Sequence, residues 1–176
     1  VSPLGKTVDI PIENGFVGMV DRAQFDEWLR QRAVLAGATR EDGLFESLQR
    51  EGANVRIYYR TRGTRDGDHG DLKSVLAKAV VGADGAKSQV GRSAGVKGCA
   101  EANYVFAYHE IIKTPSQQPL SFDGTRCDVL YQKPVSPDFY GWVFPHGDTI
   151  SVGTGSADKG FSLRNAVAKL RADIGL

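Results

Sequence analysis

The sequence is poor in the residues that define metal sites and disulfide frameworks. Its only two cysteines, Cys99 and Cys127, belong to no C-x-x-C pair, so the chain has neither a disulfide framework nor a zinc-finger pattern. The chain has only three histidines, and none is placed in the sequence to complete a metal site with those cysteines. We therefore expect a reducing, cytoplasmic setting and no metal site.

Long apolar runs and an excess of one charge are also missing. No stretch of about 18 apolar residues occurs, so the sequence predicts no membrane-spanning helix. The formal net charge is +1, which gives no reason to expect a nucleic-acid partner. The 176 residues begin at Val1 without a methionine or a signal-like segment, and we expect them to be the middle section of a longer chain.

Common nucleotide-binding and hydrolase motifs are absent as well. The dinucleotide fingerprint G-x-G-x-x-G occurs nowhere, and the nearest approach, Gly153-Thr154-Gly155, lacks the third glycine. No P-loop, H-E-x-x-H or G-x-S-x-G is present. The sequence therefore contains none of these motifs, and they assign no catalytic residue. His109 and Glu110 fall on opposite faces of a predicted strand and form no catalytic pair, so His109 is expected to be structural.

The spacing of apolar residues predicts a fold in which strands outnumber helices. A helix is expected from an N-cap at Asp21 to a stop at Gly37, with Phe25 and Trp28 on its apolar stripe, and another is expected after Ser162. Strands are expected at residues 7–12, 55–60, 74–81, 104–112, 126–132, 139–144 and 149–153. An exposed loop rich in glycine and charge is expected over 61–71, and a turn over 146–148 is expected to join the last two strands as a hairpin. Because no helix separates the strands after residue 100, the fold class is α+β with an antiparallel sheet.

The segment Pro137–Pro145 is rich in aromatic residues. If it is extended, Tyr140, Trp142 and Phe144 share one face, because side chains alternate along a strand. Phe139 and Gly141 then fall on the other face, where the glycine leaves a gap. Three rings in a row line either a protein core or a pocket for a long apolar ligand, and periodicity alone leaves both interpretations open.

An Asp-Gly turn follows the strand that ends at Val81. Asp84 and Gly85 could bring a carboxylate and a close-lying backbone against a ribose or nicotinamide, although an ordinary turn is the simpler interpretation. Ser88 could cap a short helical turn that carries Arg92. Together the strand, turn and helical turn form a more specific unit than the Asp-Gly pair alone.

Arg22 lies at the predicted start of the first helix. A cation is electrostatically disfavoured at a helix N-terminus unless something anionic lies nearby. The position therefore points either to a contact with a cofactor pyrophosphate or to a plain surface arginine.

Three motifs together resemble FAD-dependent hydroxylases and reductases, and the third is similar to a motif of geranylgeranyl reductases. They are Met19–Arg22 with Phe25-Asp26 and Leu29-Arg30, Val80–Ser88 with Arg92, and Pro137–Pro145 with Val152–Gly155. The resemblance covers nearly the whole chain. It is strongest to the bacteriochlorophyll and chlorophyll branch of that family.

The resemblance implies an antiparallel substrate-binding sheet with flanking helices, joined to part of a Rossmann-like FAD domain. Residues 1–100 would be the partial FAD-binding domain, and residues 101–176 the substrate-binding domain, which would continue beyond the chain. By analogy, the FAD contacts would be Arg22, Asp84 and Gly85. The residues near the isoprenoid would be Tyr140, Trp142 and Phe144.

The resemblance also implies an activity: reduction of C=C bonds of a geranylgeranyl group to phytyl, with FAD as cofactor and NADPH as electron donor. The substrate would be a geranylgeranylated pigment or free geranylgeranyl diphosphate, and a pigment substrate would allow contact with the photosynthetic membrane. No proton donor is evident apart from the Tyr140 hydroxyl, which lies on the ligand-facing row.

Two alternatives to this function stay open. One is an FAD-dependent aromatic hydroxylase of the same superfamily, and the other is a non-catalytic domain that binds apolar ligands. Since the fingerprint glycines are missing, the 176 residues alone are expected to hold FAD weakly and to be inactive.

Overall fold

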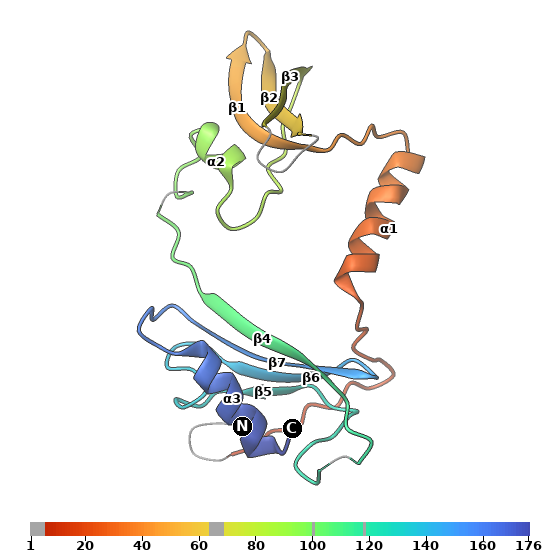
Figure 1. The fold of residues 1–176 in the computed structure, drawn as a ribbon, viewed down its shortest axis with the longest axis vertical. Coiled ribbons are helices and arrows are strands. Elements are labelled where there is room, and N and C mark those ends of the chain that lie inside the picture. The colour runs from red at the N-terminus through yellow and green to blue at the C-terminus, as the bar shows by residue number, and fades with distance from the viewer. Residues whose placement is uncertain (1–5, 64–68, 100, 118) are drawn as a thin grey trace. The chain divides into compact units, whose positions relative to one another are not determined.

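The computed structural model describes residues 6–63, 69–99, 101–117 and 119–176. The chain divides into two compact units (Figure 1): one is Ala23–Ala102, and the other joins the segment ending at Arg22 to Asn103–Leu176. Each unit contains one antiparallel sheet. The predicted α+β class with antiparallel strands is therefore confirmed.

Helix α1 (Arg22–Leu35) ends where the sequence predicts. Gly37 adopts a φ of +99°, a left-handed conformation that glycine accepts without strain. The apolar stripe of α1 stays exposed within the described residues, since Phe25, Trp28 and Leu29 keep 37%, 48% and 45% of their surface accessible. No helix in the described part of the chain is both long and apolar enough to cross a membrane.

The first sheet has the order β1-β2-β3, formed by β1 (Gly43–Glu51), β2 (Asn54–Arg62) and β3 (His69–Ala77). The predicted strand over 55–60 lies within β2. Strand β1 was not predicted, because a bulge between Phe45 and Ser47 breaks its apolar alternation. The predicted loop over 61–71 is wrong at both ends, which belong to β2 and β3, and its residues 64–68 lie outside the described residues.

The second sheet has the order β4-β7-β6-β5. Its strands are β4 (Phe106–Lys113), β5 (Asp128–Leu130), β6 (Gly141–Pro145) and β7 (Thr149–Ser156). The predicted hairpin of β6 and β7 is confirmed, with His146 N–H donating to the carbonyl of Thr149 at 2.7 Å to close its turn.

Helix α3 (Leu163–Ile174) covers one face of this second sheet (Figure 1). Ser162 caps it as predicted, because its hydroxyl accepts from Asn165 N–H. Val167 and Leu170 are buried to 0% and 1% exposure in the core cluster of the unit. The sheet contributes Val143, Ile150 and Val152 to the same cluster. Each such side chain contributes about 1.5–3 kcal/mol on burial.

The predicted strand over residues 7–12 is wrong. The segment has no regular structure, and Val8, Ile10 and Ile12 are 79%, 82% and 55% exposed. Alternating apolar residues form a strand only where a partner supplies hydrogen bonds, and no strand pairing among the described residues includes this segment.

Leu170→Ala should destabilise the unit that contains α3 by about 2–5 kcal/mol, because it removes a buried side chain from the core and leaves a cavity. The measurement is urea unfolding of the chain followed by circular dichroism. Lys169→Ala on the exposed side of the same helix turn is the control, with an expected loss of about 0.5 kcal/mol or less. Equal losses for the two variants would contradict the core described here.

Candidate aromatic ligand site

The face of the second sheet opposite α3 carries a row of aromatic rings. The register pairs Trp142 of β6 with Gly153 of β7, and Gly153 in turn with His109 of β4. Since side chains alternate along strands, these positions share the face that α3 does not cover. Val143 and Val152, one residue away on β6 and β7, are buried on the α3 side.

The three predicted ring residues form a continuous row. The ring centroids of Tyr140 and Trp142 lie 6.1 Å apart, and those of Trp142 and Phe144 lie 6.3 Å apart. Two further rings extend the row around Tyr140: Phe139 stacks on it at 4.2 Å and Tyr131 lies at 5.8 Å. We call these five residues the aromatic wall: Tyr131, Phe139, Tyr140, Trp142 and Phe144.

Two details of the predicted strand over 139–144 are wrong. The strand begins at Gly141, and Phe139 lies in the bend before it, so the alternation that would put Phe139 on the opposite face does not apply. The predicted gap at Gly141 is filled, because a Cβ there would collide with the side chain of Val135 and lie 3.4 Å from Leu170 Cδ2.

A hydrogen-bond network joins three strands at the centre of the wall. Trp142 Nε1–H donates to Ser151 Oγ at 3.1 Å, and His109 Nδ1 lies 3.2 Å from the same oxygen. The prediction that His109 and Glu110 point to opposite faces is confirmed, since Glu110 accepts from Arg171 of α3 at 2.6 Å. His109 was expected to be structural, and Ser151 was not singled out. Their proximity to Trp142 can be recognised only from the strand register, because the three residues lie on three different strands.

A polar clamp fixes the approach to β6; it consists of Ser136, Asp138 and Ser156. One carboxylate oxygen of Asp138 accepts from Ser156 Oγ at 2.6 Å, and the other accepts from Ala157 N–H at 2.9 Å. Ser136 donates to the Gly155 carbonyl at 2.7 Å and accepts from Phe139 N–H at 2.8 Å. The Ser156 hydroxyl, followed by the Ala157 N–H, lowers the pKa of Asp138. The clamp thereby holds Phe139 and Tyr140 beside β7.

The Asp-Gly turn belongs to the other unit and is held by its own short helix, α2 (Gln89–Ser93). One oxygen of Asp84 accepts from Ser88 Oγ at 2.5 Å, and the other accepts from the Gln89 and Val90 N–H groups at 2.6 and 3.1 Å. The Ser88 bond, then the backbone bonds, lower the pKa of Asp84. Ser88 also caps α2 as predicted, by accepting from Gly91 N–H at 2.8 Å.

Gly85 leaves the backbone of the turn open. It has a φ of +82°, and a Cβ added there would meet nothing within 4 Å. A glycine of this kind lets a ligand approach the backbone closely.

Arg22 is the first residue of α1 and is exposed. The first turn of α1 contains no acidic residue, so the partial positive charge of the helix end is not offset from within that turn. Arg22 and Asp84 belong to different units of the chain.

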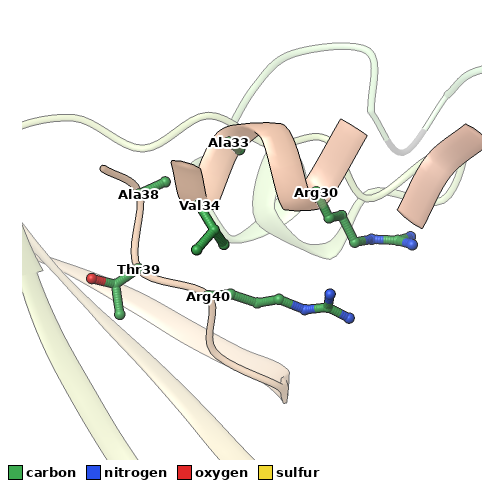
Figure 2. Close-up of a pocket in the computed structure, with 6 residues that line it drawn as sticks. All are labelled: Arg30, Ala33, Val34, Ala38, Thr39 and Arg40. Atoms are coloured by element: carbon green, nitrogen blue, oxygen red, sulfur yellow. The ribbon is translucent and has the colours of Figure 1, made fainter. Parts of the chain in front are cut away.

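A pocket of about 150 Å³ lies at the C-terminal end of α1 (Figure 2) and contains none of the predicted site residues. Two arginines border it, and Figure 2 shows both guanidinium groups extending to the same side. Glu27 pairs with both, at 3.6 Å from Arg30 and 2.8 Å from Arg40. The pocket is lined by Arg30, Ala33, Val34, Ala38, Thr39 and Arg40.

Comparison with known proteins identifies the class to which these features belong. Residues 7–144 match the model of the FAD binding domain family. The chain therefore belongs to the FAD-binding domain family.

Comparison with individual relatives gives a more specific similarity. The chain is 47% identical over all 176 residues to geranylgeranyl diphosphate reductase of Rhodobacter capsulatus. It is 35% identical over 162 residues, 89% of the chain, to the chloroplastic geranylgeranyl diphosphate reductase of Arabidopsis thaliana. It is also 33% identical over 161 residues, 87% of the chain, to digeranylgeranylglycerophospholipid reductase 1 of Methanopyrus kandleri. These matches confirm the resemblance to FAD-dependent geranylgeranyl reductases.

The chain spans less than half the length of these relatives. The aligned segments make up 43% of the Rhodobacter capsulatus protein, 34% of the Arabidopsis thaliana protein and 38% of the Methanopyrus kandleri protein.

Asp138→Asn should lower the unfolding midpoint at neutral pH, because an amide offers only one accepting oxygen to Ser156 and Ala157. The folded pKa of Asp138 is lowered, so its contribution is fully present above the ordinary value of 3.8 and is lost as the pH falls through the folded value. The difference between parent and variant should therefore shrink in acid. The measurement is thermal unfolding across pH.

Asp173→Asn, on an exposed ion pair of α3, provides a matched control for the clamp. A difference between parent and Asp138→Asn that stays constant down to the most acidic pH would show that the carboxylate bonds do not hold this segment.

Proposed function

We propose that the chain is part of a flavin-dependent reductase that saturates C=C bonds of a geranylgeranyl group. The observation that carries this proposal is the continuous aromatic wall on the face of the sheet that α3 leaves uncovered. The printed names of the relatives, which specify geranylgeranyl diphosphate and digeranylgeranylglycerophospholipid reductases, support it.

The wall has the chemistry that an isoprenoid requires. A prenyl chain offers almost no hydrogen bonds, so it is bound by apolar and aromatic surface. From Tyr140 to Phe144 the row extends about 13 Å along the strand. The side chains of Tyr140, Trp142 and Phe144 are each only partly buried. That surface remains for the methyl-branched chain to cover.

The Asp-Gly turn fits one edge of FAD. Gly85 has room for a close-lying ligand, and Asp84 is held ionised by bonds to Ser88 and the α2 backbone. A carboxylate can accept about four hydrogen bonds, so accepting capacity remains at Asp84 for a ribose hydroxyl. Arg22 would meet the pyrophosphate, with its cation close to the N-terminus of α1.

FAD, when reduced and bound, supplies the hydride for one alkene carbon, and a proton reaches the other. The residues of the wall hold the alkene and exclude water from it. The Tyr140 hydroxyl is the candidate proton donor on this row. NADPH would be the source of reducing equivalents.

We assign residues 1–100 to a partial, Rossmann-like FAD-binding domain and residues 101–176 to the substrate-binding domain. The division between the two compact units at Ala102 and Asn103 supports a boundary near residue 100, whereas the segment ending at Arg22 is grouped with the later unit. The substrate would be a geranylgeranylated pigment or geranylgeranyl diphosphate. A membrane-embedded pigment would bring the protein to the photosynthetic membrane surface.

The test is a chimera in which this chain replaces the aligned segment of the Rhodobacter capsulatus relative, supplied with NADPH and geranylgeranylated pigment or geranylgeranyl diphosphate. We expect products that gain mass in steps of two hydrogens. Oxygen insertion into an aromatic ring would instead identify a hydroxylase, and ligand binding without turnover would identify a binding domain.

Within the chimera, Tyr140→Ala should lower kcat/KM for the prenyl substrate by about tenfold, since it removes a ring that stacks on Phe139 and borders Trp142. Tyr140→Phe keeps the ring and loses the hydroxyl, so a selective fall in kcat would assign that hydroxyl to proton transfer. Tyr108→Ala is the control, because Tyr108 lies on the α3 side of the same sheet. An equal loss of kcat/KM from Tyr108→Ala would contradict the proposal that the aromatic wall binds the substrate.

A further inference from the structure

Trp142, the central ring of the aromatic wall, is held against β7 by two contacts. Its Nε1–H donates to Ser151 Oγ at 3.1 Å. Gly153, its partner in the ladder, leaves the space that the indole occupies. A Cβ at position 153 would stand 2.5 Å from Trp142 Cε2 and 2.7 Å from His109 Cβ, so any side chain there would displace the indole.

The hydroxyl of Ser151 is itself fixed from two sides. The indole N–H can only donate, so Ser151 Oγ accepts from Trp142 and its hydrogen is free to point to His109 Nδ1, 3.2 Å away. Ser151 is only 6% exposed, which leaves water little access to the hydroxyl. The oxygen that receives the indole N–H is therefore held in one place.

We propose that Ser151 and Gly153 are positioning residues that keep the Trp142 indole over the backbone of β7, and that they thereby strengthen the binding of a prenyl chain to the aromatic wall. In this position the indole lies between the rings of Tyr140 and Phe144 and keeps the row unbroken. If the indole rotated away from β7, the row would be interrupted at its centre. The binding part of this inference rests on the proposed function, whereas the orientation part rests on the contacts alone.

The orientation is tested in the full 176-residue chain carrying Trp28→Phe, in which Trp142 is the sole tryptophan. Ser151→Ala should raise the acrylamide quenching constant of Trp142 and shift its emission to longer wavelength, because the indole is no longer held to Ser151. Ser151→Thr, which keeps the hydroxyl, should restore both. Gly153→Ala should change both more strongly, since the added methyl displaces the ring.

Ser162→Ala is the matched control, because it makes the same chemical change at the cap of α3, away from the wall. It should lower the unfolding midpoint and leave the quenching constant unchanged. If Ser151→Ala leaves quenching and emission as in the parent, or if Ser162→Ala alters them equally, the orientation part is overturned. The Ser151→Ala and Ser151→Thr pair decides this even where Gly153→Ala fails to fold.

Prenyl binding is tested in the chimera with geranylgeranyl diphosphate as the probe. Ser151→Ala should raise KM about fivefold with kcat nearly unchanged, because it removes binding that substrate and transition state share. A released indole with an unchanged KM would overturn the binding part. A parent chimera that reduces no prenyl chain would contradict the proposed function and the binding part that rests on it, and would leave the fluorescence result to decide the orientation.

Discussion

The packing of α3 on one face of the second sheet is the constraint on which the aromatic site depends. Val167 and Leu170 bury themselves against Val143 and Val152, and residues next to these in β6 and β7 must then point the other way. The aromatic wall therefore occupies the one face that the core does not use. Because core and site share the same strands, a change that shifts β6 along β7 would disturb both together.

Hydrogen bonds, rather than the apolar core, determine the path of the chain before β6. The clamp at Asp138 ties the bend at Phe139 to the end of β7 through two nearly inaccessible serines, Ser136 and Ser156, at 3% and 1% exposure. Buried hydroxyls without partners would be costly, so the bend has few other positions available. Hydrogen bonds thus hold the start of the aromatic wall in place, while the packing of α3 positions the strands that carry the rest of it.

The sequence correctly predicted the features that depend only on neighbouring residues. Ser162 and Ser88 as caps, Gly37 as a stop and the hairpin turn at Gly147 all follow from neighbouring residues. Features that depend on pairing were missed or misplaced. The bulge in β1 hid that strand, Val135 filled the space beside Gly141, and the link between His109 and Ser151 required the register of three strands. The roles of Arg22, Asp84 and Gly85 toward a cofactor are likewise beyond local geometry, because they depend on a ligand.

Two glycines in β7 limit how the aromatic wall can change through mutation. Gly153 lies under Trp142, and a Cβ on Gly155 would stand 2.9 Å from both Phe139 Cδ1 and Val105 Cγ1. The surface beneath these rings is therefore bare backbone, and any substitution at Gly153 or Gly155 would add atoms that displace the rings. Changes that keep the wall intact are instead available on the neighbouring strand β4, where Ala107 and Ile111 face the same side and are exposed.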